Sequence, residues 1–461
     1  MRLDRESMQE ILNNLKVFNS LKNYNFQRLH MPGHKGMEEI FPDGIKNAYP
    51  YFDVTETVYT DDLLNPTSFL KEFLEAINSF FGSRYSFLSL QGSTHLLQST
   101  IAAFSKPFGS ILINRDAHKS IYNIAKILRL DIEYIYPRYD LLLGVYTYID
   151  ERELEETLEK TKSEIVVITS PSYYGINQDI KAISALTKRY NKKLIVDQAH
   201  GGYYKFVGKE TALDEGADVC IMSLHKTLPC PNQSALLLSN LEDNGKLNEM
   251  LTCLHTTSPS YVLVLWSEYG IEFSKRFGEA LYHELEKKLR ELYLPILEYT
   301  NYQFKNMDIL KLLFDFGKLG HGIEDIKVLL LRYSIVPEAI DQRRILFYFS
   351  IIDSFSNFEN LKGFFYDIIK EKVKTQKKPF PLPPRPKKIL KIYEIDDYKK
   401  TKVKLKNADG LICAKAIIPY PPGYPVVAEG EVIDKDIIEY LKEVLGKDYI
   451  EENEVDVVDE R

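Results

Sequence analysis

The segment Ser223-Leu-His-Lys-Thr-Leu-Pro229 follows the apolar run Ala217-Asp-Val-Cys-Ile-Met222, which is typical of a buried strand. Lys226 is therefore expected where a strand gives way to a loop. A second apolar run, Lys193-Leu-Ile-Val196, ends in Asp197-Gln-Ala-His200. An aspartate and a lysine at the ends of successive strands suggest a pyridoxal phosphate (PLP) site, with a Schiff-base lysine and a carboxylate on the pyridine nitrogen. A surface lysine is the simpler interpretation of Lys226 alone, so the hypothesis depends on the other motifs.

The composition is that of an ordinary globular protein of 461 residues, 44% hydrophobic and 27% charged, long enough for two or three domains. The net charge of −7 argues against a nucleic-acid partner, because neutralising phosphates needs a basic face. We expect neither a signal peptide nor a membrane span, since no basic start precedes an apolar core and no run of about 18 apolar residues occurs. The four cysteines form no C-x-x-C pair, so we expect no metal site and a cytoplasmic location.

Strand and helix patterns alternate through the first half of the chain, which predicts an α/β fold with a mostly parallel, doubly wound sheet. We expect strands at residues 85–90, 110–113, 132–136, 164–170, 193–196 and 217–222. A strand at residues 234–238 follows the lysine loop too closely for a crossover helix, so it should run antiparallel. Ligands of such sheets bind beyond the strand C-termini. Five motifs fall at such ends, namely those at Gly92, His118, Tyr173, Asp197 and Lys226.

The stretch Gln91-Gly-Ser-Thr94 lies between a predicted strand and a predicted helix. Backbone N–H groups and the helix dipole would face an anion there, and Ser93 and Thr94 add donors. Serine and threonine are also ordinary N-caps, so this feature alone leaves both capping and phosphate binding open.

Five regions are predicted along the chain. They are an N-terminal segment (1–52) with a helix carrying Ile11, Leu12, Leu15 and Phe18, a large PLP-binding domain (53–270), a small αβ domain (271–376), a proline-rich linker (377–386) and a C-terminal domain (387–461). Five prolines in the last eight residues of the linker predict a stiff spacer.

The motifs together resemble the prokaryotic Orn/Lys/Arg decarboxylase family, short form, whose members are PLP-dependent enzymes of fold type I. The matching segments are 30–36 (HMPGHKG), 53–56 (DVTE), 92–94 (GST), 118–120 (HKS), 197–200 (DQAH), 223–229 (SLHKTLP), 257–261 (TSPSY), 419–423 (PYPPG) and 430–431 (GE). They follow the family order over nearly the whole chain. The resemblance implies a three-layer αβα sandwich with a mostly parallel sheet, plus smaller α+β C-terminal domains.

The resemblance also implies roles for individual residues. Lys226 resembles the Schiff-base lysine and Asp197 the partner of the pyridine nitrogen. His118 resembles the histidine that stacks on the ring, with Ala199 on the opposite face. The implied phosphate cradle comprises Gly92, Ser93, Thr94, Ser223 and His225, and His200 completes the cofactor-binding set of this subunit. Lys226 and His225 are candidates for the proton donor, although His225 could serve the phosphate alone.

Two further implications concern the neighbouring subunit and the substrate. Active sites of this fold commonly lie at a subunit interface, which implies a homodimer or a multiple of dimers. Ser258 and Ser260 are implied to reach the phosphate of the neighbouring subunit. Glu431 is implied to receive the distal cation of a basic amino acid.

Three segments depart from the family pattern: Gln198 stands where a glutamate is usual, residues 57–65 lack the usual glycine and histidines, and residues 335–350 match poorly. The resemblance implies decarboxylation of arginine, lysine or ornithine to an amine that feeds polyamine metabolism. Two alternatives stay open. One is transamination or lyase chemistry on the same fold, and the other is an inactive PLP-binding homologue with a regulatory role.

Overall fold

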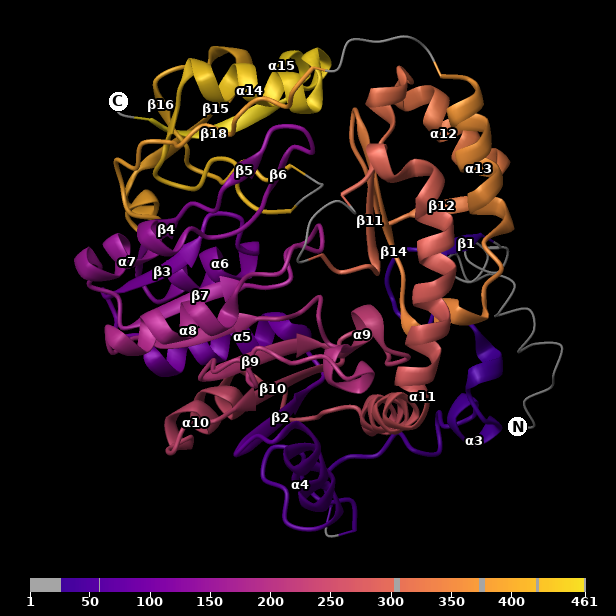
Figure 1. Ribbon diagram of the computed structural model, residues 1–461. Helices are drawn as coiled ribbons and strands as arrows, with labels where there is room; N and C mark the ends of the chain where they lie inside the picture. The colour runs from indigo at the N-terminus through magenta and orange to yellow at the C-terminus, as the bar shows by residue number, and fades with distance from the viewer. Residues whose placement is uncertain (1–25, 58, 302–306, 373–377, 420–422, 460–461) are drawn as a thin grey trace, which may run out of the picture.

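The computed structural model describes residues 26–57, 59–301, 307–372, 378–419 and 423–459. The N-terminal helix predicted from Ile11 to Phe18 therefore lies outside the described residues. Figure 1 shows a large unit around a central sheet, a second unit with a smaller sheet, and a C-terminal unit above the large one. In the part of the chain that is described, no helix has both the length and the apolar character needed to cross a membrane.

The central sheet has seven strands in the order β2-β10-β9-β8-β7-β3-β4. Their bounds are β2 Tyr85–Ser89, β3 Ser110–Asn114, β4 Asp131–Ile135, β7 Ile165–Thr169, β8 Lys193–Asp197, β9 Val219–Ser223 and β10 Ala235–Ser239. Strand β10 runs antiparallel to both of its neighbours, as its short connection from β9 predicts, and the other adjacent pairs are parallel. The prediction of a mostly parallel sheet is confirmed.

Alternate side chains of each strand enter two different hydrophobic cores, one on each face of the sheet. In β8, for example, Leu194 and Val196 join one core and Ile195 joins the other. Helices α5 (Gly92–Phe104), α6 (Lys119–Ile127) and α10 (Gly245–Leu254) cover the face of Ile195. Helices α4 (Phe69–Phe81), α7 (Glu151–Lys160) and α8 (Ile180–Arg189) cover the other face. The result is the predicted three-layer sandwich.

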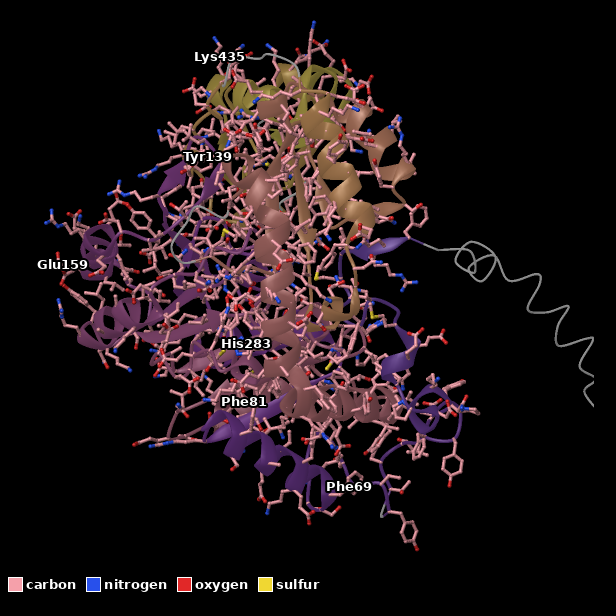
Figure 2. The ribbon with its side chains drawn as sticks, turned by 45° about the vertical axis from the view of Figure 1, so that its right-hand side comes forward. Phe69, Phe81, Tyr139, Glu159, His283 and Lys435 are labelled. Atoms are coloured by element: carbon pink, nitrogen blue, oxygen red, sulfur yellow. The ribbon has the colours of Figure 1, made fainter. Side chains whose placement is uncertain are left out.

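Helix α11 (Tyr261–Tyr293) links the large unit to the smaller sheet, and its part around His283 is the vertical ribbon at the centre of Figure 2. It passes through the predicted boundary between residues 270 and 271 without a break, because its buried side chains continue on both sides of that point.

The smaller sheet is antiparallel, in the order β11-β14-β13. The elements of this unit are β11 Lys311–Asp315, α12 Ile323–Arg332, β12 Ile335–Pro337, β13 Ala339–Ile340, β14 Arg344–Tyr348 and α13 Glu359–Lys370. Strand β12 pairs in parallel with β1 (Gln27–Leu29).

The C-terminal unit has its own core, in which Ile437 and Leu441 of α14 pack near Val457. Its elements are β15 Lys399–Lys404, β16 Leu411–Ile412, β17 Val432–Ile433, α14 Lys435–Leu445, α15 Lys447–Glu452 and β18 Glu454–Asp459. Residues 378–386 of the predicted linker contain neither helix nor strand. The remaining short elements are α3 Asp43–Lys46, the hairpin β5 Tyr139–Asp140 with β6 Val145–Tyr146, and α9 Leu224–Thr227.

Candidate active site

The C-terminal ends of the parallel strands open onto a cavity of about 470 Å³, a size that suits a small-molecule ligand. Ten of the predicted cofactor-binding residues lie in its lining: Gly92, Ser93, Thr94, His118, Asp197, Ala199, His200, Ser223, His225 and Lys226. Gly423 and Tyr424 of the C-terminal unit also line it. The cavity therefore gathers segments from both ends of the described chain.

The order of the strands fixes the order of the chemical groups across the cavity. Lys226 lies in α9 after β9, Asp197 ends β8, and Thr169 ends β7. The next strand, β3, ends at Asn114 and is followed by Asp116. Because neighbouring strands lie about 4.8 Å apart, these groups are spread across the floor of the cavity.

Lys226 and Asp197 are both largely withdrawn from water. Burial lowers the pKa of Lys226, an effect that Asp197 and Glu338 oppose. Burial raises the pKa of Asp197, and the Lys226 cation and the N–H of Ala199 oppose that change. The same Ala199 N–H donates to Asp197 Oδ1 at 3.1 Å. A lowered lysine pKa makes the neutral, nucleophilic amine more available.

The other end of the cavity is built to hold an anion. Helix α5 begins at Gly92, whose φ of +74° favours glycine, and no side chain caps its first N–H groups. Ser223 Oγ donates to Ser93 Oγ at 2.8 Å, which places two hydroxyls beside this helix end. The Gly92 N–H donates to the carbonyl of Gln233 at 2.8 Å, and the N-terminus of a helix, with its dipole and remaining N–H groups, is a binding site for phosphate.

Two histidines of the lining are held by local hydrogen bonds. His118 Nδ1 accepts the N–H of Ser120 at 3.3 Å, which leaves its other nitrogen to carry the proton. His225 Nδ1 donates to the carbonyl of Ser234 at 2.9 Å, and burial lowers the pKa of His225 to about 4. Burial and the charges of Lys226 and Lys119 also lower the pKa of His118 to about 4, so both rings are neutral around neutral pH.

The cavity fits the predicted cofactor on one independent observation. Thr169 Oγ1 is buried in the lining and has no hydrogen-bond partner among the described residues. A polar ligand in the cavity would satisfy it, since a buried hydroxyl without a partner is costly. PLP would suit the rest of the lining: Lys226 could hold its aldehyde, Asp197 its ring nitrogen and the α5 end its phosphate.

The structure does not bring Ser258 and Ser260 into the cavity of the same chain. Ser258 is exposed, and Ser260 caps α11 by accepting the N–H of Leu263 at 3.5 Å. Their predicted contact with the phosphate of a neighbouring subunit stays a prediction.

Glu431 has a different environment from the one expected. It is 1% exposed, and its two carboxylate oxygens accept hydrogen bonds from Arg115 at 2.6 and 2.8 Å. The N–H of Ala428 donates to the same carboxylate at 2.7 Å. This geometry argues against the predicted role of Glu431 as receptor of the substrate cation, because Arg115 already neutralises its charge.

Asp116 is the acid of the lining that the sequence analysis did not select, although it stands two residues before His118. Asn114 Nδ2 donates to its Oδ1 at 2.7 Å, and burial raises its pKa. Within the described ranges, no lysine, arginine or histidine lies within ion-pair distance of it. Asp116 is therefore an acidic side chain of the cavity that has no positively charged partner among the described residues. Thr169, Asn232, Gln233 and Tyr424 were missed as well: the first three stand in no charged or glycine-containing motif, and Tyr424 directly follows the motif at 419–423.

Two departures from the family pattern have clear positions. Gln198 Oε1 accepts the N–H of Ala212 at 3.2 Å, so this amide is bonded within the large unit and leaves the cavity lining unchanged. Residues 335–350 contain β12, β13 and β14, and their last strand brings Tyr348 next to His200.

The sequence matches known proteins over most of its length. Residues 11–289 match the family described as "Orn/Lys/Arg decarboxylase, major domain", and residues 391–448 match "Orn/Lys/Arg decarboxylase, C-terminal domain". The uncharacterized protein YaaO of Bacillus subtilis is 28% identical, with 92% of each chain covered. An arginine decarboxylase of Bacillus anthracis is 27% identical, over 91% of this chain and 90% of its own length.

Solved structures support the same fold. The lysine decarboxylase LdcF of Francisella novicida has a TM-score of 0.69 at 16% identity, covering 100% of this chain and 84% of its own. The constitutive lysine decarboxylase of Escherichia coli has a TM-score of 0.68 at 18% identity, covering 99% and 84%.

Proposed function

Since the chain belongs to the Orn/Lys/Arg decarboxylase family and is a PLP-dependent amino-acid decarboxylase, we propose that its substrate is a basic amino acid, with arginine as the first candidate. Relatives named arginine decarboxylase match the chain over about nine-tenths of both lengths, whereas the lysine decarboxylase structures support the fold alone. The amine product would feed polyamine metabolism.

The observation that carries the proposal is the arrangement of Lys226, Asp197 and the α5 end around one cavity. When bound, PLP supplies an electron sink that stabilises the negative charge left at Cα as CO₂ departs. Lys226 would provide the amine that holds the cofactor, and the Asp197 carboxylate would accept a hydrogen bond from the protonated ring nitrogen and so keep the proton there. His118 and Ala199 supply the walls on either side of the ring.

Asp116 is the group that we propose for the cationic end of the substrate. The lining contains two acids, and Asp197 is engaged by the cofactor, which leaves Asp116. A carboxylate that is partly withdrawn from water gains most from a charged partner brought by the ligand. Tyr173 and Tyr424 in the same lining offer apolar surface for the methylene groups of a basic side chain.

A product assay tests the reaction. Purified protein is supplied with PLP and with arginine, lysine or ornithine in turn, and CO₂ and the amine are quantified. We expect stoichiometric CO₂ and amine, fastest with arginine. Formation of an oxo acid would instead indicate transamination, and no turnover of any of the three would indicate the regulatory alternative.

The variant Asp116→Asn tests the substrate site. We expect kcat/KM for the preferred substrate to fall about 30-fold or more, which corresponds to about 2 kcal/mol for a desolvated charge pair. The PLP absorbance should stay unchanged. Glu151→Gln, an exposed acid at the start of α7, is the control and should leave kcat/KM unaltered. An unaltered value for Asp116→Asn would remove this residue from the substrate site.

We further propose a homodimer, or a multiple of it, in the cytoplasm. Several aromatic side chains of residues 49–59 are exposed, among them Tyr51 at 82% and Tyr59 at 91%, and such a patch favours burial against another subunit. The four cysteines are free, which fits a reducing compartment. Light scattering should give at least twice the chain mass, and an active monomer would contradict the assembly.

A further inference from the structure

His200 stands between the reactive lysine and a tyrosine of the smaller sheet. Its Nε2 lies 3.2 Å from Lys226 Nζ, and its Nδ1 lies 3.4 Å from the hydroxyl of Tyr348. The His200 ring meets the rings of Tyr173 and Tyr348 edge to face, at centroid distances of 5.8 and 5.6 Å. We propose that Tyr348 and His200 form a positioning pair that turns the lone pair of Lys226 Nζ toward the cavity. This inference rests on the proposed role of Lys226 as the cofactor lysine.

The hydrogen bonds of Tyr348 decide which nitrogen of His200 carries the proton. The Tyr348 hydroxyl lies 2.5 Å from the carbonyl oxygen of Tyr173. A carbonyl can only accept, so the single phenolic proton points to Tyr173. The bond to His200 must then be donated by Nδ1–H, with the Tyr348 oxygen as acceptor.

A neutral imidazole carries one N–H, so the Nε2 of His200 keeps a bare lone pair. That lone pair faces Lys226 and accepts one of its N–H bonds at 3.2 Å. A neutral amine that donates one hydrogen in this direction directs its own lone pair elsewhere. The opposite tautomer would donate into the amine lone pair and block it.

The surroundings keep His200 neutral, so that it holds the lysine without removing its proton. Its ring is 8% exposed, and burial together with the positive charges of Lys226 and Lys311 lowers its pKa well below the ordinary value. Lys35 donates to the Tyr348 carbonyl, and Glu338 accepts a hydrogen bond from the Tyr173 hydroxyl. The other titratable groups around His200 are His118, His225, Asp197, Tyr173 and Tyr348. A proton leaving Lys226 must therefore depart on the cavity side.

Two substitutions of His200 separate a hydrogen-bonding role from a packing role. Gln offers an amide oxygen as an acceptor near the position of Nε2, whereas Phe keeps the ring and loses the acceptor. The rate at which the full-length protein, stripped of PLP, captures added PLP covalently is followed by stopped-flow absorbance between pH 6 and 9. We expect His200→Gln to stay within about 3-fold of the unmodified protein and His200→Phe to fall at least about 10-fold.

The variant Tyr348→Phe tests the second member of the pair. It removes one hydroxyl and keeps the ring, and we expect PLP capture to slow about 3- to 10-fold with an altered pH profile. Tyr293→Phe is the matched control, because this buried tyrosine also donates to a backbone carbonyl, that of Ile309 at 2.8 Å, outside the cavity. It should leave capture unchanged.

A direct readout of the tautomer needs no enzymatic turnover. Protein labelled with ¹⁵N-histidine should show the His200 signal as the Nδ1–H form, and Tyr348→Phe should convert part of it to the Nε2–H form. A dominant Nε2–H form in the unmodified protein, or equal capture rates for the Phe and Gln variants of His200, would overturn the proposal. Capture is measured without amino acid, so failure of the decarboxylase assay leaves this test intact.

Discussion

Arg115 and Glu431 form two hydrogen bonds of 2.6 and 2.8 Å, with neither side chain more than 3% exposed. Arg115 follows β3 of the central sheet, and Glu431 precedes β17 of the C-terminal unit. Arg115 also donates to the carbonyl of Val426, and its guanidinium lies over the ring of Tyr134. The pair therefore fastens the C-terminal unit to the rim of the cavity, next to Asp116.

Replacing Glu431 by Gln should destabilise this junction. A buried guanidinium that loses its counter-ion costs about 3–5 kcal/mol. We expect a lower urea midpoint, or an early transition confined to the C-terminal unit, measured by near-ultraviolet circular dichroism and limited proteolysis. A loss of kcat/KM with unchanged stability would restore Glu431 as a substrate-binding residue.

The neighbouring Glu429 offers the matched control for that variant. It pairs with Lys126 at 2.6 Å, but both side chains are partly exposed. Exposed pairs contribute about 0–1 kcal/mol, so Glu429→Gln should barely move the urea midpoint.

Lys226→Ala should abolish turnover, because the cofactor loses its attachment amine. In the unmodified protein, borohydride treatment followed by peptide mapping should place the pyridoxyl group on Lys226. Lys119→Ala, which alters an exposed lysine beside His118, should keep both activity and label. A label on another lysine would overturn the assignment.

Asp197→Asn should retain the fold and lose most of the rate. Asp197 is 3% exposed and faces the cavity, so its carboxylate would pair with the protonated ring nitrogen in a dry environment. Loss of one member of such a pair costs about 3–5 kcal/mol, or about 100-fold or more in kcat. A near-normal kcat, with PLP content verified by absorbance, would show that Asp197 is not at the ring.

Acid should weaken the protein through His95 of α5. Its Nε2 donates to the carbonyl of Leu251, its ring is 5% exposed, and burial lowers its pKa from 6.5 to about 4. The unfolded chain binds this proton more readily, so stability is full above pH 6.5 and is lost as the pH falls toward 4. The loss should approach about 3 kcal/mol.

Urea unfolding at pH 7 and at pH 4.5 measures this effect. His95→Gln, which cannot take up the proton, should remove the His95 share of the pH dependence and leave the share of other buried histidines such as His225, whereas His283→Gln on the exposed surface of α11 should leave all of it. Equal pH dependence in the His95 variant and the unmodified protein would contradict the assignment.

The strands of the central sheet could be predicted from the sequence because they are short apolar runs with loop residues at their ends. It also identified the residues whose chemistry is unusual for their position, such as Lys226 at a strand end and Gly92 before a helix. The antiparallel direction of β10 followed from chain length alone. These are local signals, and the structure agrees with them.

The sequence could not show partners chosen across long distances. Arg115 and Glu431 are 316 positions apart, and nothing in either segment indicates that they pair. For the same reason Asp116 was passed over, since its lack of a cation is visible only when its surroundings are known. The boundary predicted at residue 270 falls within α11, a helix that runs through both units.

The walls of the cavity come from segments scattered from Met31 to Tyr424. Contacts between such distant segments close large loops and form slowly during folding. A partly folded chain can thus have Asp197 at the end of β8 and Lys226 after β9 together but without the walls from Met31 and Tyr424, and we expect it to retain PLP poorly. Absorbance from bound cofactor therefore reports completed folding, and PLP supplied during synthesis should raise the yield of folded protein by mass action.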